Sequence, residues 1–130
     1  MRLADAITRS ESHRQRAYQL NAQDISEYFI FTALAMECFR AINSLIEIGQ
    51  AVIARGKMVV PDTYRQVFEV LGQHQIILLE AADAGKRLVF LRNLIAHEDH
   101  MISEEELREA VALLSQMDAL LEIAKQEARG

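Results

Sequence analysis

The fold is decided by residues 25–55, which read ISEYFIFTALAMECFRAINSLIEIGQAVIAR. Apolar residues recur there every three or four positions, so the spacing predicts one long helix that ends at Arg55. One apolar line consists of Ile30, Leu34, Cys38, Ala41, Leu45, Ile48 and Val52. Ile25, Phe29 and Met36 form a second line on another face. A helix with two apolar faces has to bury both, either inside one subunit or partly against a second subunit.

Local signals predict where this helix and the one before it begin and end. Asn21 or Asp24 is expected to cap the long helix, because a side-chain oxygen there can accept hydrogen bonds from its first free N–H groups. Gly56 is expected to end it as the residue just past the last turn. A preceding helix is predicted over about residues 2–20.

Two further helices are predicted after the turn at residues 56–61. Asp62 is placed to cap a short helix that runs through Leu71 and is broken by the Gly-Gln pair at 72–73. A longer helix is expected from about residue 76 to residue 97, with apolar residues on one face. The short helix is therefore an insertion between two long ones.

The C-terminal part of the chain opens with a capping box. Ser103 and Glu106 have the required spacing, in which each side chain accepts a hydrogen bond from the other residue's backbone N–H. One last helix is expected to follow. The sequence thus predicts an all-α fold, an antiparallel helical bundle of four to five helices with one short inserted helix, in a single domain over residues 1–130.

The net negative charge of the chain restricts how it can bind nucleic acid. The 130 residues are 51% apolar and 25% charged, and the net charge is −5. That balance excludes general electrostatic capture of nucleic acid, so any contact with phosphates has to come from a local basic patch. Residues 1–20 are one candidate, because they carry four arginines against two acidic residues. The alternative is that these charges are simply solvated helix faces.

Localisation signals favour a soluble cytoplasmic protein. The single Cys38 leaves no intramolecular disulfide, and no charged-then-apolar secretory leader opens the sequence. The longest apolar run, residues 28–36, is about half the length of a bilayer-spanning helix. We therefore expect no membrane association.

Candidate chemistry lies in residues 90–100, which read FLRNLIAHEDH. None of the four histidines has a glutamate three residues earlier, as a di-iron bundle requires, so we expect no metal and no cofactor. Cleavage of a phosphodiester without a metal needs a base that titrates near neutral pH and a fixed cation with several donors. His97 and Arg92 are the right residue types. Asn93 is four residues before His97, so its amide could orient the imidazole or the phosphate.

Spacing alone leaves the role of this pair open. On an ideal helix five residues rotate by about 140°, so Arg92 and His97 point in different directions. They converge only if the helix loosens near His97, if Arg92 curls around, or if a partner subunit completes the cleft. Otherwise they are a salt-bridge arginine and a helix-end imidazole. A further alternative is that His97 and His100 bind a divalent ion incidentally.

Three stretches carry a resemblance to a known family. They are AME at 35–37, PDTYRQVFEVL at 61–71 and FLRNLIAHE at 90–98. In their order and spacing, the span from about Tyr28 to Leu107 resembles the HepT-like toxin family of the HEPN superfamily. The resemblance implies an all-α bundle that dimerises and brings two Arg-x-x-x-x-His motifs together at a cleft. It also implies a metal-independent endoribonuclease toxin that acts on RNA and has a nucleotidyltransferase antitoxin as partner.

The resemblance also assigns roles to individual residues. Arg92 and His97 would be the catalytic pair, and Asn93 would be the polar residue that usually follows the arginine. Glu37 resembles the acidic residue of the long helix that can pair with the motif arginine. Asp99, followed by His100, stands where the family motif usually has the tyrosine that the antitoxin nucleotidylates.

The aspartate is a departure from the family pattern, because a carboxylate cannot serve as a phenolic acceptor. Asp99 could instead repel phosphate, or it could steer His97 through a hydrogen bond. The alternative function is therefore a catalytically inactive HEPN-fold interaction subunit that partners a minimal nucleotidyltransferase. In that case the contact would be made by Tyr28, Phe31 and other exposed apolar residues of the long helix.

Overall fold

The computed structural model describes residues 2–97 and 102–130, and over these ranges the chain is helical, with no strand. The elements in order are α1 (Arg2–Asn21), α2 (Tyr28–Arg55), α3 (Tyr64–Gln73), α4 (Leu79–Ala96), α5 (Glu104–Leu114), a short 3-10 turn (Ser115–Met117) and α6 (Asp118–Arg129). The prediction of an all-α bundle with one short inserted helix is confirmed.

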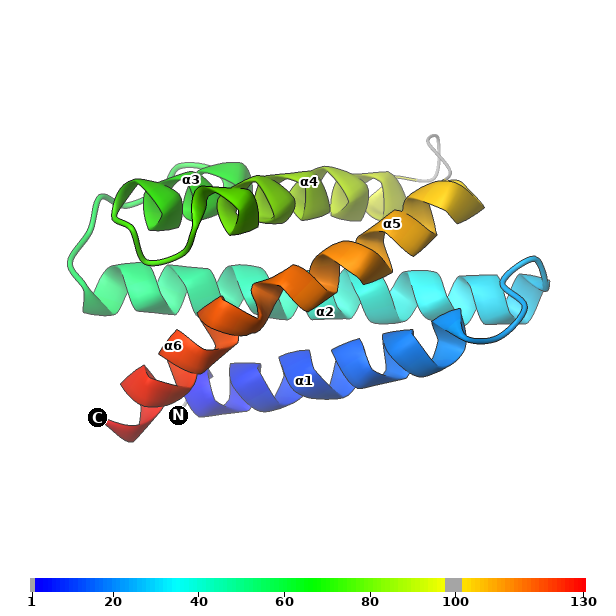
Figure 1. Cartoon of the computed structure of the whole chain (residues 1–130), viewed down its shortest axis with the longest axis horizontal. Helices are drawn as coiled ribbons and strands as arrows, with labels where there is room; N and C mark the ends of the chain where they lie inside the picture. The colour runs from blue at the N-terminus through cyan, green and yellow to red at the C-terminus, as the bar shows by residue number, and fades with distance from the viewer. Residues whose placement is uncertain (1, 98–101) are drawn as a thin grey trace.

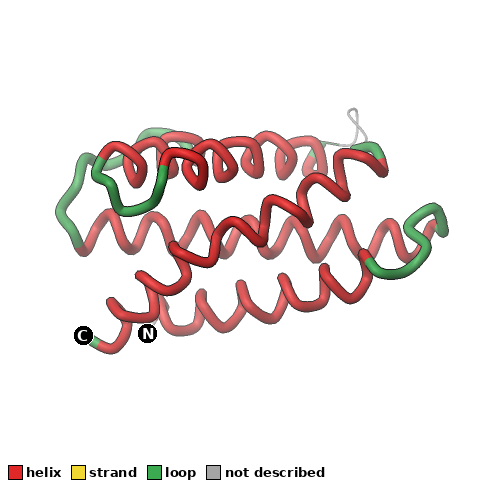
Figure 2. Tube along the Cα trace, in the orientation of Figure 1, coloured by secondary structure: helices red, strands yellow, loops and turns green. Residues whose placement is uncertain are grey.

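The long helix α2 lies in the middle of the bundle (Figure 1). Helix α1 runs antiparallel to α2 along one side, and α3 and α4 lie along its other side. Helices α5 and α6 cross in front of these elements, and the two chain ends lie at the same end of the molecule (Figure 2). One face of α2 is therefore left uncovered between α1 and α4.

Burial of α2 follows the two apolar lines of the sequence unequally. The first line is buried from Leu34 to Val52, and Ile30 packs against it half-buried. The second line is divided, because Ile25 is buried in the α1–α2 loop whereas Phe29 and Met36 remain 74% and 42% exposed. Helix α2 has the length and mean hydropathy (1.5) of a membrane-spanning helix, but eleven of its residues are buried in this core.

The predicted N-terminus of α2 was wrong by several residues. Glu27 caps the helix, with its carboxylate accepting from the Ile30 N–H at 3.0 Å. Asp24 instead accepts from the N–H and the hydroxyl of Ser26, so it closes a turn within the loop. At the other end the helix stops at Arg55 as expected, but the left-handed residue of the following turn is Lys57 (φ 54°) rather than Gly56.

The inserted helix also begins and ends later than predicted. Thr63 caps α3 by accepting from the Gln66 N–H at 3.1 Å, whereas Asp62 uses its own N–H to bond the Gln66 side chain. The helix continues to Gln73 and is ended by Gln75, which has a φ of 59°. Helix α4 consequently starts at Leu79, three residues later than expected.

Close packing at one glycine sets the distance between α3 and α4. A Cβ added at Gly85 would lie 2.2 Å from the ring of Phe68, which is fully buried on α3. Glycine therefore costs α4 some intrinsic helix propensity but lets the two helices approach closely. This contact fixes α3 and α4, which both contribute to the candidate site, relative to each other.

The capping box at Ser103 and Glu106 is confirmed, with both hydrogen bonds present. The single last helix is not, because a 3-10 turn divides it into α5 and α6. At this bend the Ser115 hydroxyl donates to the Ala112 carbonyl at 2.6 Å, a back-bond that tends to bend helices. Arg14 of α1 donates to the Leu114 carbonyl at 3.2 Å, which satisfies an acceptor where the helix changes direction.

Candidate functional site

Helix α4 ends just before the candidate imidazole. His97 has extended backbone angles (φ −105°, ψ 115°), and its N–H donates to the Asn93 carbonyl at 3.1 Å. The side chain of His97 is exposed. The helix therefore loosens at His97, which is one of the three routes by which Arg92 and His97 could converge.

Arg92 is held in place by two amides and two aromatic rings. Its Nε donates to Asn43 Oδ1 at 2.8 Å, and its Nη1 donates to Asn93 Oδ1 at 3.1 Å. The guanidinium lies 5.1 Å from the centre of the Phe39 ring and 5.3 Å from that of Tyr64. No carboxylate among the described residues lies within ion-pair distance of it, so its charge is oriented but not neutralised by them.

A polar pocket of about 220 Å³ opens beside Arg92. Its lining residues are Asn43, Ile46, Glu47 and Gln50 of α2, Tyr64 of α3 and Arg92 of α4. Glu47 is paired with Arg9 of α1 at 3.0 Å, so the carboxylate nearest to this pocket already has a cationic partner. The remaining donors of Arg92 are thus available to an anionic ligand, because the guanidinium carries five N–H groups and two are used.

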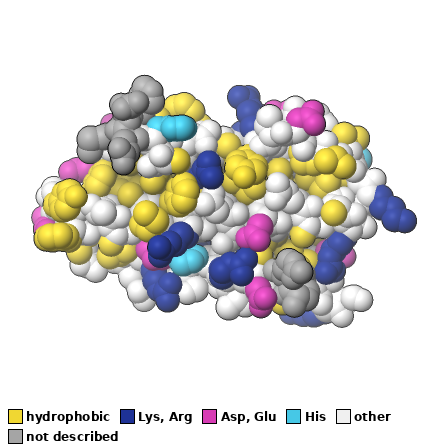
Figure 3. All heavy atoms as spheres, turned by 180° about the vertical axis from the view of Figure 1, so that it is seen from behind, with side chains coloured by type: hydrophobic (Ala, Val, Ile, Leu, Met, Phe, Trp, Pro, Cys, Tyr) yellow, Lys and Arg dark blue, Asp and Glu magenta, His cyan; other side chains and the backbone are white. Residues whose placement is uncertain are grey.

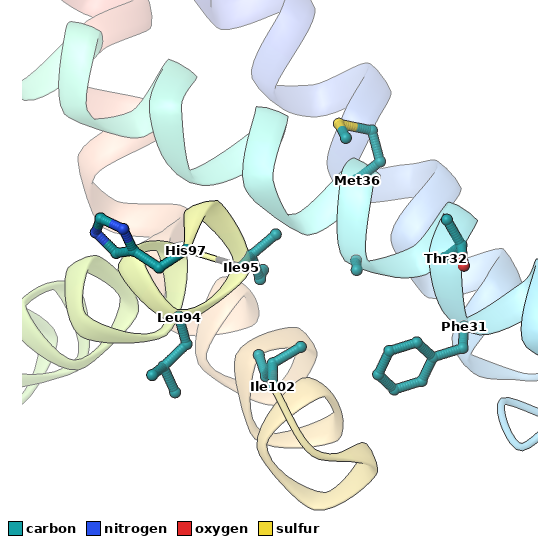
Figure 4. Close-up of a pocket in the computed structure, with 8 residues that line it drawn as sticks. Phe31, Thr32, Met36, Leu94, Ile95, His97 and Ile102 are labelled. Atoms are coloured by element: carbon teal, nitrogen blue, oxygen red, sulfur yellow. The ribbon is translucent and has the colours of Figure 1, made fainter. Parts of the chain in front are cut away.

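His97 lines a different, mainly apolar groove of about 230 Å³. Side chains of α2, including Phe31 and Met36, form one wall, and Ile95 and Ile102 contribute to the other. The imidazole points away from Phe31 and Ile102 (Figure 4). Within one chain, Arg92 and His97 therefore line separate cavities on the same side of α2.

Glu37, which the resemblance implied could pair with the motif arginine, does not pair with Arg92 within the chain. Its Oε1 lies 2.7 Å from His13 Nδ1 on α1 and 3.9 Å from Arg16 Nη1. The reason is helical geometry, since positions 37 and 43 are about 120° apart around the axis. Glu37 faces α1, whereas Asn43 faces α4 and supplies the oxygen that Arg92 uses.

Sequence analysis missed the residues that surround Arg92. Asn43, Phe39 and Tyr64 lie 49, 53 and 28 positions before it, and no local pattern links them to the motif. His13 was missed as the partner of Glu37 for the same reason. Asp99 and His100, which were predicted as supporting residues, lie outside the described residues.

Two further kinds of reactive group were considered in the part of the chain that is described, namely metal-binding clusters and the thiol of Cys38. Over residues 2–97 and 102–130, no group of three or more His, Cys, Asp or Glu side chains is arranged to hold a metal ion. Burial, with a smaller effect of the nearby Glu37 charge, raises the pKa of the Cys38 thiol to about 12. Cys38 is therefore a protonated core residue at neutral pH.

The described chain is an all-α bundle with an oriented arginine and, five residues later, an exposed histidine at a helix end. The sequence matches the family described as Ribonuclease HepT-like over residues 3–126. The chain belongs to this family, and the resemblance identified from the sequence is confirmed. No curated protein matches the chain.

Solved structures support the same fold. A HEPN toxin of Shewanella oneidensis, tri-AMPylated and in complex with MNT antitoxin, has a TM-score of 0.85 and 18% identity, covering 96% of this chain and 97% of its own. A mutant of the toxin–antitoxin MntA-HpeT has a TM-score of 0.84 and 18% identity, covering 97% and 99%. YutE, a cytosolic protein of unknown function from Bacillus subtilis, has a TM-score of 0.69 and 17% identity, covering 91% and 85%. At these identities the likeness establishes the HEPN fold alone.

Proposed function

We propose that this chain is the toxin of a toxin–antitoxin pair and a metal-independent endoribonuclease that acts as a cytoplasmic homodimer. Membership of the HepT-like family and the toxin–antitoxin complexes among its structural neighbours support the role. The observation that carries the enzymatic part is Arg92, whose guanidinium is fixed by Asn43 and Asn93 without a described carboxylate partner. A cation held in this way is suited to a phosphate whose charge grows in the transition state.

The proposed reaction uses the ribose of the RNA as its own nucleophile. His97 acts as general base and takes the proton of the 2′-hydroxyl, so that the 2′-oxygen attacks phosphorus. Arg92 donates hydrogen bonds to the non-bridging oxygens as negative charge builds on them. The bond to the 5′-oxygen breaks, and this oxygen receives a proton from a general acid. The products are a 2′,3′-cyclic phosphate and a 5′-hydroxyl.

A second copy of the chain completes this proposal. In a homodimer one His97 can act as base while its counterpart acts as acid, which a single imidazole cannot do in one step. The separation of Arg92 and His97 into two cavities of one chain favours such sharing. The exposed Phe29 on the uncovered face of α2 is suitable for burial against a partner.

The antitoxin partner is proposed to be a minimal nucleotidyltransferase. The Shewanella oneidensis toxin is described as tri-AMPylated in its complex with MNT antitoxin. In this chain the position of the family's acceptor tyrosine is Asp99, which has no phenolic hydroxyl. We therefore expect an antitoxin to inhibit this toxin either by binding alone or by modifying another residue. The substitution Asp99→Tyr should create an acceptor for nucleotidylation.

The test is cleavage of single-stranded RNA by the purified protein in excess chelator. His97→Ala should abolish cleavage and leave the helical circular dichroism spectrum unchanged. His74→Ala is the matched control, because His74 is also an exposed histidine at the end of a helix. Loss of wild-type activity in chelator, or normal cleavage by His97→Ala, would show that the proposed mechanism is wrong.

The second candidate is an inactive interaction subunit of the same fold. Tyr28 and Phe29 favour it, because they are 71% and 74% exposed at the start of α2 and form an edge-to-face pair with ring centres 5.4 Å apart. Exposed aromatic residues of this kind are enriched at protein interfaces. Co-purification with a nucleotidyltransferase without any RNA turnover would establish this function in place of the nuclease.

A further inference from the structure

A wide groove between α1 and α2 is not used by the proposed reaction. It has a volume of about 520 Å³, and Arg16, Gln19, Gln23, Met36, Glu37 and Arg40 are among its lining residues. We propose that this α1–α2 groove binds backbone phosphates of single-stranded RNA through Arg16 and Arg40. The inference rests on the proposed ribonuclease function and adds the path that the substrate follows away from the cleavage site.

The two arginines of the groove are available to a ligand. Arg40 is exposed and has no carboxylate within 4.0 Å among the described residues. Arg16 is 57% exposed, and its nearest carboxylate oxygen, on Glu37, lies 3.9 Å away. That oxygen is also bonded to His13 at 2.7 Å, so the only acidic residue lining the groove is already occupied. Both guanidinium groups can therefore turn toward a phosphate without breaking a close ion pair.

Six of the other twelve Lys and Arg side chains have a close carboxylate partner among the described residues. Those with a carboxylate closer than Arg16 has are Arg9, Arg14, Arg65, Lys86, Arg87 and Lys125. Pairing of these charges is consistent with a chain whose net charge of −5 repels nucleic acid as a whole. A local site with two available arginines is the kind of patch that such a protein needs to hold an RNA strand.

The α1–α2 groove adjoins the groove that contains His97. Met36 lines both this groove and the groove that contains His97. In the view of the uncovered face, basic side chains gather beside a hydrophobic band over the bundle (Figure 3). A strand cleaved at His97 can therefore extend past Met36 with its phosphates near Arg40 and Arg16.

The chemistry of the groove favours a phosphate backbone over an acidic protein segment. Gln19 and Gln23 are exposed amides that can donate to phosphate oxygens or sugar hydroxyls. Guanidinium groups pair with phosphate through two parallel N–H donors. The position of the groove next to that of His97 supplies the second reason, because the proposed nucleophile at His97 is a ribose hydroxyl of RNA.

The experiment measures binding of a 2′-O-methyl single-stranded RNA, which keeps its phosphates but lacks the nucleophilic hydroxyl. The wild-type protein is compared with the double variant Arg16→Gln/Arg40→Gln over a range of salt concentrations. Loss of two phosphate contacts should lower the slope of log K against log salt by about 1.4 and weaken binding about 20-fold at 0.1 M salt. The control is Lys57→Gln/Arg129→Gln, which removes the same charge from two exposed positions outside the groove.

The outcomes separate this inference from the proposed nuclease. If the wild type binds the probe through Arg16 and Arg40 but does not cleave unmodified RNA, the nuclease proposal fails and the groove remains an RNA site. If unmodified RNA is cleaved and the double variant binds the probe as the wild type does, the groove proposal fails alone. The groove proposal also fails if the control variant loses as much affinity for the probe as the double variant, or if the wild type does not bind the probe. It fails likewise if the double variant binds the RNA probe normally and loses only the binding of a protein partner.

Discussion

The two residues of the Arg-x-x-x-x-His motif are held very differently by the same chain. Arg92 lies in a polar pocket, with hydrogen bonds to Asn43 and Asn93 and two aromatic rings against its guanidinium. His97 lies five residues later, beyond the end of α4, exposed at an apolar groove. One chain therefore preorganises the cation but leaves the imidazole to be positioned by its surroundings.

Arg92 and His97 are held differently because different helices form the cavity around each of them. The pocket of Arg92 is built by α2, α3 and α4, which are packed together through the Gly85–Phe68 contact. The groove of His97 is formed by α2, the end of α4 and Ile102 in the segment that precedes α5. Apart from loss of the imidazole itself, we expect substitutions around Arg92 to have larger effects than substitutions around His97, because three helices together position the guanidinium.

After the loss of activity expected for His97→Ala, the largest expected effect is on the cation. Arg92→Lys keeps the charge but cannot bond Asn43, Asn93 and a phosphate in the same plane, so RNA cleavage should fall by about 10²–10³-fold. Cleavage rates with saturating RNA measure this loss. Arg65→Lys, at an exposed arginine of α3 paired with Glu69, is the control. Activity of Arg92→Lys within a few-fold of the wild type would mean that charge alone is sufficient.

The next effect should come from the spacing of α3 and α4. Gly85→Ala places a Cβ against the Phe68 ring, and such overpacking costs about 1–3 kcal/mol of unfolding free energy. Because Tyr64 and Arg92 are on the two helices concerned, cleavage should fall as well. Urea unfolding measures the first effect. Gly130→Ala is the control, since its Cβ would meet no atom closer than 3.7 Å, and equal stability of the two variants would contradict the packing argument.

Contacts between helices, such as the one between Gly85 and Phe68, could be predicted from the sequence only in part. The capping box at Ser103 and the end of α2 at Arg55 were predicted correctly, because the signals lie within a few residues. The cap at Glu27 was missed because glutamate is not among the preferred capping residues. The break at residues 115–117 was missed because apolar positions keep helical spacing across it.

The candidate site was predictable as residue types rather than as contacts. Arg92, Asn93 and His97 were proposed because they are close together in a stretch that carries the family resemblance. The orientation of Arg92 depends on Asn43, which is 49 residues away, and on which side of α2 faces α4. For the same reason the sequence did not show that Glu37 faces α1 and pairs with His13. Such choices follow from packing between helices, which one sequence does not display.

A smaller effect is expected from the amide that orients the guanidinium. Asn43→Ala removes the acceptor of the 2.8 Å bond from Arg92 Nε, and we expect kcat to fall about tenfold with little change in KM. Combining it with Arg92→Lys provides the control. If Asn43 acts through Arg92, it should add little to the loss caused by Arg92→Lys, whereas full additivity would show an independent role.

The smallest effect concerns an ion pair of α4 that touches neither cavity. Arg87 donates to Glu109 of α5 at 2.8 and 3.0 Å, and these hydrogen bonds lower the pKa of the Glu109 carboxyl below its ordinary value of 4.5. Because the folded-state pKa is depressed, the stabilisation is present above that value and is lost as the pH falls through the folded pKa. Both side chains are substantially exposed, so Arg87→Gln should cost only about 0.5 kcal/mol at pH 7.

Urea unfolding of Arg87→Gln and the wild type at pH 7 and at about pH 3 checks the sign of this effect. The difference between the two proteins should shrink at the lower pH. RNA cleavage at pH 7 should be unchanged. A difference that grows on acidification would assign the stabilisation to another group.

Cys38 has a practical consequence for following the two halves of the motif in solution. It is the only cysteine of the chain, and its buried, protonated thiol will not react with maleimide at neutral pH while the protein is folded. A cysteine introduced at the exposed Gln50, beside Arg92, would therefore be labelled selectively in an otherwise native background. A fluorophore attached there could report arrival of a ligand at the cation without any preceding removal of a native thiol.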